Sequence, residues 1–410
     1  MLFSVGLILL LGFSIGKLFN KIKLPSLIGM IIVGILIGPS VLNLIDPGMY
    51  QPVLGGKTLS AILRQIALVV IITRAGLSLN ISDLKKLGHS ALLMCFVPAT
   101  FEIIGVTIFG PMIFGISYFE AMLLGSVLGA VSPAIIVPRM IKLQEEGYKS
   151  VANLVLTGAS CDDVFVIILF YSFLGLVENN VFEMNMLYEL PLSIILGILL
   201  GVIVGLGVRY LFNVIRIKGT VKFLLVLSLS FIMLGIEDLL KPYVAVSSLL
   251  GVMAMGILLN KDLETQGELK TSYNGMWTFF EVILFVLVGS ELNIEYALNS
   301  FGPGLLLLLG SLTFRSLGVL VCLIGTKFNW KERGFIIMAY LPKATVQASI
   351  GGIALSMNLP CGALVLTIAV LSIVITAPVG AFLIDLTYKR LLKTDEEKEN
   401  SLKLKEFEAK

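Results

Sequence analysis

Eight charged side chains interrupt the long apolar stretches of this sequence, and they are the residues with which the chain could do chemistry. An ionisable group in such surroundings is costly unless it is paired or hydrated, so each one is a functional candidate. They are Arg64, Arg74, Glu102, Asp162, Asp163, Glu281, Arg315 and Lys343.

Two of these charges, Asp162 and Asp163, are neighbours in the tract GASCDDVF. Adjacent residues on a helix point about 100° apart, so the two carboxylates cannot face the same partner. One can face a protein cation while the other faces a water-filled cavity. Burial favours the protonated form of a carboxylate and a nearby cation favours the ionised form, so a proton and a metal cation can compete for the same oxygens.

Two apolar stretches are broken by proline beside polar residues. In AVSPAIIVP, Pro133 removes a backbone donor and Ser132 supplies a hydroxyl at the break. In LPKATVQASIGG, Pro342 precedes Lys343, and a Gly–Gly pair follows. Interrupted helices in corresponding positions of two halves indicate a transport site.

The elements that position these residues are membrane helices. The chain has 410 residues, of which 57% are hydrophobic and only 14% are charged, and its mean hydropathy is +0.99. Such a composition cannot cover a soluble surface, and in lipid only helices or closed barrels satisfy the backbone. The basic residues lie in short loops, which gives no indication of nucleic-acid binding.

Apolar runs between charge clusters predict an all-α polytopic membrane protein with about thirteen transmembrane helices. The predicted spans are approximately 2–18, 25–45, 59–79, 88–109, 118–138, 150–177, 190–208, 220–237, 243–260, 273–290, 302–326, 333–356 and 363–387. Lys and Arg concentrate in alternate loops, which predicts an external N-terminus and a cytoplasmic C-terminus in the cell (inner) membrane. Residues 388–410 form a charged cytoplasmic tail.

The sequence also contains an internal repeat. SLIGMIIVGILIG (26–38) and SLLGVMAMGILLN (248–260) share six of thirteen positions, and IITRAGLSLN (71–80) resembles LFVLVGSELN (284–293). These matches align spans 1–6 with spans 8–13 and leave span 7 as a linker. Because six plus one is odd, the second copy has the opposite orientation, which is the 6+1+6 inverted repeat of many secondary transporters.

The repeat places a glutamate and an arginine at equivalent positions. Glu102 follows Asn80 by 22 residues, and Arg315 follows Asn293 by 22 residues. Pseudo-twofold symmetry predicts that they meet at similar depth and neutralise each other. Arg64 and Arg74 lie toward opposite ends of their span and are predicted to extend to the membrane interface. Glu281 either lines a cation path or accepts a hydrogen bond.

The tracts AVSPAIIVPRM, GASCDDVF and LPKATVQASIGG resemble the monovalent cation/proton antiporter superfamily, specifically its NHA-type sodium/proton branch. The resemblance implies that Asp163 carries the cation (Na⁺ or Li⁺) or the proton, with Asp162 and Ser132 beside it. Lys343 belongs to the second of two crossing, broken helices, which are spans 5 and 12. Two departures from many double-aspartate relatives, Arg315 and the pair Val131–Ser132, leave the proton-to-cation ratio open.

The resemblance also implies a division of the exchanger domain, residues 1–387. A homodimer forms through a dimer part at about 1–79 and 220–290. A mobile core at about 88–177 and 302–387 moves against it, and the linker helix spans about 190–208. The partners are monovalent cations, protons and the lipid bilayer, and no cofactor is implied.

Other function classes fit the sequence less well. The buried polar groups cluster at one depth, whereas a channel needs polar stripes along a pore. No pattern of a membrane protease is present, and we expect the protein not to be an enzyme. K⁺/H⁺ antiport and sodium-coupled solute symport remain the alternatives, and the absence of a solute-sized set of polar groups disfavours the symporter.

Overall fold

The structure is a computed structural model. It describes residues 1–22, 24–54, 57–78, 88–179, 186–215, 218–240, 243–244, 246–260 and 263–397. Parts of the sequence interpretation concern residues outside this set. They are Leu79 and Asn80 of the repeat, the charged residues of predicted loops Lys23, Lys85, Lys86, Glu183, Arg216, Lys241 and Lys261, and the tail from 398 onward.

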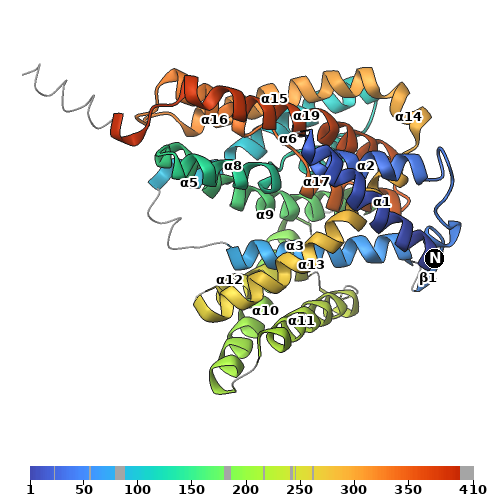
Figure 1. Cartoon of the computed structure of the whole chain (residues 1–410). Coiled ribbons are helices and arrows are strands. Elements are labelled where there is room, and N and C mark those ends of the chain that lie inside the picture. Colours follow the sequence, from blue (N-terminus) through green and yellow to red (C-terminus); the bar gives the residue numbers. More distant parts are fainter. Residues whose placement is uncertain are drawn as a thin grey trace, which may run out of the picture.

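The described chain is almost entirely helical, as the composition predicts (Figure 1). The first half contains α1 (Leu2–Lys21), α2 (Ser26–Ile37), α3 (Leu59–Ser78), α5 (Gly88–Met94), α6 (Val97–Phe114), α7 (Tyr118–Leu128), α8 (Pro133–Glu145) and α9 (Lys149–Asn179). A short helix, η1 (Pro47–Met49), and an antiparallel pair of strands, β1 (Pro52–Leu54) and β2 (Lys57–Thr58), connect α2 to α3.

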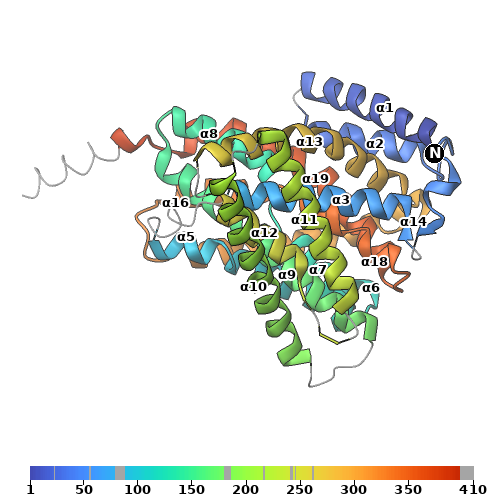
Figure 2. The same cartoon turned by 90° about the horizontal axis from the view of Figure 1, so that it is seen from below.

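Helix α10 (Met186–Val214) joins the two halves at the position predicted for the linker. The second half contains α11 (Gly219–Leu240), α12 (Ser248–Leu259), α13 (Leu263–Ser290), α14 (Ile294–Asn299), α15 (Phe301–Cys322), α16 (Trp330–Ala339), α17 (Thr345–Ile350), α18 (Ile353–Ser356) and α19 (Gly362–Leu391). Figure 2 shows α10 and α11 in front of the other helices when the molecule is seen from below.

The described residues include eight helical segments long and apolar enough to cross a membrane. They are 2–21, 89–114, 118–145, 192–214, 219–240, 265–290, 301–322 and 362–397. Shorter apolar helices lie at 26–37, 165–178 and 248–259. The all-α membrane fold is confirmed, whereas the count of thirteen spans stays a prediction because several predicted spans are short or interrupted.

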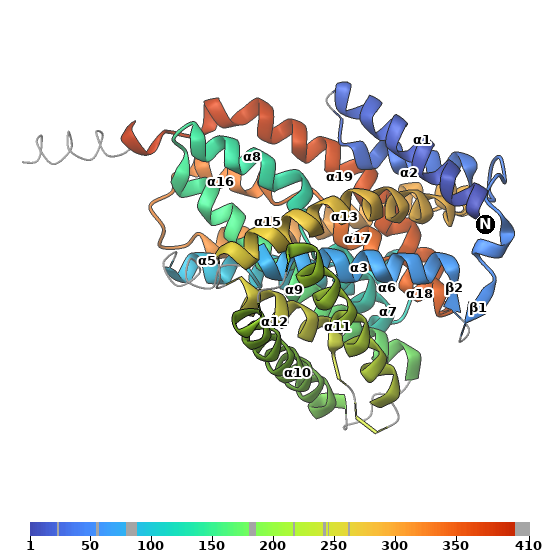
Figure 3. The ribbon, with the colours of Figure 1, turned by 60° about the horizontal axis from the view of Figure 1, so that its bottom comes forward.

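The packing of the helices follows the predicted repeat. Helix α2 packs against α13, and its repeat equivalent α12 packs against α3 (Figure 3). A Cβ at Gly34 of α2 would lie 2.0 Å from the carbonyl oxygen of Val286, and one at the equivalent Gly256 would lie 3.0 Å from that of Thr73. Glycine allows the backbones to approach this closely in both halves. The two copies therefore make the same kind of helix contact.

Both predicted interruptions are present. Residues 129–132 separate α7 from α8, and Pro133 begins α8 at a position where its missing N–H costs no helical bond. Residues 340–344 separate α16 from α17, and α17 ends before the pair Gly351–Gly352. The helix before each break starts with a capping box. The pair is Ser117 with Glu120 in α7 and Asn329 with Glu332 in α16. The sequence thus specifies both the starts of these helices and their breaks.

Candidate functional site

The two interrupted helices meet at their breaks. The backbone N–H of Ser132 donates to the carbonyl oxygen of Pro342 at 2.8 Å. The Gln347 side chain donates to the carbonyl oxygen of Ala130 at 2.9 Å, and it accepts from the N–H of Ala344 at 2.8 Å. These backbone groups at the breaks are therefore satisfied, either by the other broken helix or by Gln347 beside the break. Such satisfaction is the condition for irregular backbone inside a membrane.

Asp162 faces this crossing and is fully buried, with 0% of its surface exposed. Its Oδ2 accepts from Arg315 Nη2 at 2.7 Å and from the N–H of Val131 at 3.1 Å. A guanidinium stays protonated, so its contact favours the ionised form of this carboxylate. Asp162 therefore faces a protein cation, as the sequence predicts for one of the two neighbouring acids.

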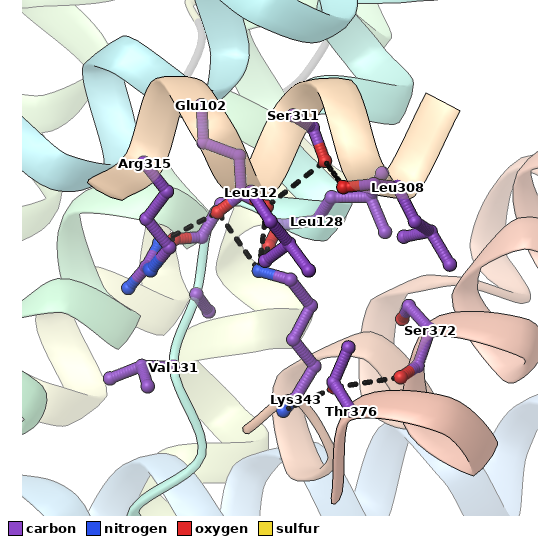
Figure 4. A network of polar contacts seen from close by, with 12 residues as sticks. Glu102, Leu128, Val131, Leu308, Ser311, Leu312, Arg315, Lys343, Ser372 and Thr376 are labelled. Carbon is purple, nitrogen blue, oxygen red and sulfur yellow. Dashed lines mark hydrogen bonds and ion pairs between the residues drawn. The ribbon is translucent and has the colours of Figure 1, made fainter. Parts of the chain in front are cut away.

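Arg315 also binds Glu102, and Lys343 binds Glu102 from the other side (Figure 4). Arg315 Nη1 lies 2.8 Å from Glu102 Oε2, and Lys343 Nζ lies 2.8 Å from Glu102 Oε1. Lys343 Nζ also donates to the carbonyl oxygen of Leu128, at the end of α7. With Asp162, the network contains two carboxylates and two cations, so its formal charges cancel inside the bundle. Lys343 therefore neutralises Glu102, on a different helix from the aspartate pair.

Asp163 points into different surroundings. It lines a cavity with a volume of about 30 Å³, which is enough for water. The lining comes from four helices and is otherwise mostly apolar: Leu68, Ile71, Ile72, Asp163, Ile167, Leu249, Leu250, Met253, Val346 and Ser349. Helices α3 and α12 supply one side of the cavity, and α9 and α17 supply the other. A carboxylate therefore faces a hollow between two groups of helices.

Ser132 lies at the crossing and is 1% exposed. Its hydroxyl makes no hydrogen bond within the described part of the chain, and it is not among the residues that line the cavity. The structure thus brings Asp162, Arg315, Glu102 and Lys343 into one network. The backbone of Ser132 contacts Pro342, the residue before Lys343. Asp163 faces the cavity and not this network.

The prediction that Arg64 extends to the membrane interface is wrong. Arg64 is 5% exposed, and its Nη1 lies 3.1 Å from Glu291 Oε2. Glu291 also accepts from the Ser60 hydroxyl at 2.6 Å. The guanidinium packs against Gly352, where a Cβ would lie 1.8 Å from Nη1. Burial is possible because the partner follows α13 and no side chain occupies position 352.

The partner of Arg64 has a sequence signal: Glu291 directly precedes Leu292 and Asn293, which belong to the repeat. Arg74 and Glu281 act on each other electrostatically between α3 and α13. Thr376 was also missed: its hydroxyl accepts from the N–H of Lys343 at 3.0 Å. No sequence motif marks this contact, because α19 meets the break only in the folded chain.

Known proteins are similar to this chain in sequence and in fold. The family described as "Sodium/hydrogen exchanger, transmembrane" matches residues 6–389. Sodium/hydrogen exchanger 9B2 of Homo sapiens is 33% identical over 95% of this chain and 75% of its own length. The Xenopus tropicalis protein of the same name is 32% identical, covering 93% and 73%.

A solved structure supports the fold. The sodium proton antiporter MjNhaP1 from Methanocaldococcus jannaschii superimposes with a TM-score of 0.77 and 21% identity, covering 94% of this chain and 95% of that one. At this identity the likeness concerns the fold alone. Since the family match extends over nearly the whole chain, this protein belongs to the sodium/hydrogen exchanger family, within the cation/proton antiporter superfamily.

Proposed function

We propose that this protein is a secondary active transporter that exchanges Na⁺, or Li⁺, for H⁺ by alternating access. The observation that carries the proposal is the position of Asp163, a carboxylate that lines a cavity between two groups of helices beside a crossing of broken helices. The names of its relatives, sodium/hydrogen exchanger and sodium proton antiporter, support the same cargo.

The mechanism follows from the cost of a charge in the membrane. An ionised carboxylate without a compensating cation is too costly to cross the apolar interior, so Asp163 crosses with either a cation or a proton bound. Because both bind the same oxygens, occupancy by one excludes the other. Exchange then follows without a separate coupling device. Asp162 is the neighbour of Asp163 on α9, and its charge is compensated by Arg315.

We propose that the moving parts are those implied by the resemblance. The core comprises α5 to α9 and α15 to α19, and it contains the neutral network of Glu102, Arg315, Asp162 and Lys343. The dimer part comprises α1 to α3 and α11 to α13, with α10 as linker. The cavity at Asp163 lies where the two parts face each other, so relative motion changes the side from which this carboxylate is reached. A homodimer formed through the dimer part would hold that part still while the core moves.

The orientation is proposed from the loop charges, with the N-terminus outside, the C-terminus in the cytoplasm and the protein in the cell membrane. Single cysteines placed at Lys57 and at Lys327 are expected to react with an impermeant thiol reagent from opposite sides of sealed vesicles. Reaction of both from the same side would contradict the arrangement.

The function is tested by proton movement in proteoliposomes under imposed gradients of Na⁺, Li⁺ or K⁺, each used separately. We expect Na⁺ and Li⁺ gradients to drive proton movement. A response to K⁺ alone would replace the proposal by K⁺/H⁺ antiport. Cation uptake that requires a co-transported solute and produces no proton movement would indicate a symporter.

A further inference from the structure

Tyr340 is a fully buried tyrosine that directly follows α16, at the start of the break that carries Lys343. Its backbone and its ring both contact Arg315, and its hydroxyl lies against α9, the helix that carries Asp162.

The backbone and the ring of Tyr340 both hold Arg315. The carbonyl oxygen accepts from Arg315 Nε at 2.7 Å. The ring centroid lies 5.5 Å from Arg315 Cζ, within the range of a cation–π contact. One edge and one face of the guanidinium are thereby fixed, while Nη2 reaches Asp162 at 2.7 Å. Arg315 reaches Asp162 through Nη2 and Glu102 through Nη1. Rotation of the planar guanidinium would move both donors, so fixing its plane matters for the bond to Asp162.

The hydroxyl of Tyr340 lies against α9. A Cβ at Gly158 would lie 1.7 Å from this oxygen, so the hydroxyl occupies the space that glycine leaves. Gly158 precedes Asp162 by four residues, which places both on the same face of the helix. Among the described residues the hydroxyl has no hydrogen-bond partner, although a buried donor without an acceptor is costly. Asp162 lies within electrostatic range of it.

We propose that Tyr340 is a positioning residue, which fixes Arg315 on Asp162 through its carbonyl and ring while its hydroxyl sets the spacing between α16 and α9 at Gly158. Asp162 is then withheld from the cargo, and Asp163 is the carboxylate at which proton and cation compete. This inference rests on the proposed function.

The test compares Tyr340→Leu, Tyr340→Phe and Tyr273→Phe in proteoliposomes. Tyr340→Leu removes the ring and the hydroxyl, and Tyr340→Phe removes only the hydroxyl. Tyr273→Phe is the matched control, because Tyr273 is also fully buried but packs against Phe223 in the other part of the molecule. The apparent KM for Na⁺ and the pH profile of exchange are measured for each variant.

A loosened Arg315 leaves the Asp162 carboxylate without its cation beside Asp163, which favours protonation of the site. For Tyr340→Leu we expect the midpoint of the pH profile to rise by about one unit. Since the proton competes with Na⁺, the apparent KM at fixed pH then rises about tenfold. Tyr340→Phe is expected to shift both in the same direction by less, and Tyr273→Phe is expected to match the parent.

A second measurement does not depend on transport. A hydrophobic carbodiimide reacts with protonated carboxyl groups, and mass spectrometry locates the adduct. We expect more labelling of Asp162 in Tyr340→Leu than in the parent. A folded Tyr340→Leu protein with the parent's KM, pH profile and labelling overturns the inference. If that variant does not fold, a Tyr340→Phe protein with parental values overturns it. If the proposed function itself is wrong, the parent protein shows no cation-driven proton movement, whatever the labelling of Asp162.

Discussion

Asp162 and Asp163 follow each other on α9, yet their carboxylates lie in different surroundings. Asp162 is bound by Arg315 inside a network whose formal charges cancel. Asp163 lines a cavity that is otherwise mostly apolar. The difference arises because successive residues on a helix point about 100° apart. One helix can therefore present a fixed charge to the core and a carboxylate for cargo to a different side.

The strongest test of this comparison is Asp163→Asn. The amide keeps the shape of the side chain but cannot ionise, so it cannot exchange a proton for a cation. We expect Na⁺-driven proton movement to fall to the level of empty vesicles, while the melting temperature and the elution volume in detergent stay close to those of the parent. Substantial exchange by this variant would refute the role assigned to Asp163.

Glu102→Gln tests the network on the other side of α9. Arg315 and Lys343 would lose the carboxylate that they share, leaving buried positive charge without compensation. Breaking a buried ion pair in this way costs about 3–5 kcal/mol. We expect a marked fall in melting temperature, followed in detergent by the fluorescence of a thiol-reactive dye.

The matched change for Glu102→Gln is Glu120→Gln. Glu120 belongs to an exposed capping box, where the expected loss is about 1 kcal/mol. Equal melting of the Glu102→Gln protein and the parent would contradict the network.

Asp162→Asn is the counterpart of Asp163→Asn. Arg315 retains Glu102 after this change, so the protein is expected to fold and to keep measurable exchange at a reduced rate. Because Asp162 binds no cargo in this assignment, the charge moved in each cycle is expected to stay that of the parent. The measurement is proton flux with and without a clamped membrane potential. If Asp162→Asn abolished exchange and Asp163→Asn spared it, the two roles would be reversed.

Gln347→Leu is expected to have the smallest effect on exchange, compared with Asp163→Asn, Glu102→Gln and Asp162→Asn. It leaves the carbonyl oxygen of Ala130 and the N–H of Ala344 without their partner at the crossing. Each unsatisfied buried group costs about 1–3 kcal/mol. We expect a moderate fall in melting temperature, with the apparent KM for Na⁺ close to that of the parent. A larger loss than in Glu102→Gln would show that the crossing depends on backbone hydrogen bonds more than on the ion network.

The sequence by itself determined the class of protein, its helical nature and the two breaks. Apolar runs, loop lysines and prolines are local signals, and lipid leaves the backbone few other conformations than the helix. The repeat also indicated that Glu102 and Arg315 occupy equivalent positions, and the structure brings them to 2.8 Å. Adjacent acids on one helix predicted two different surroundings for Asp162 and Asp163.

Only the tertiary structure decided which surroundings each acid has. Helical spacing fixes the angle between the two carboxylates, but the rotation of α9 about its axis depends on the helices packed around it. The same reason explains Arg64, whose burial requires Glu291 from α13 and the backbone of Gly352 from another helix. Lys343 binds Glu102, because α6 and α15 pack together and present that carboxylate to the break. These contacts join residues more than two hundred positions apart, so local sequence signals do not contain them.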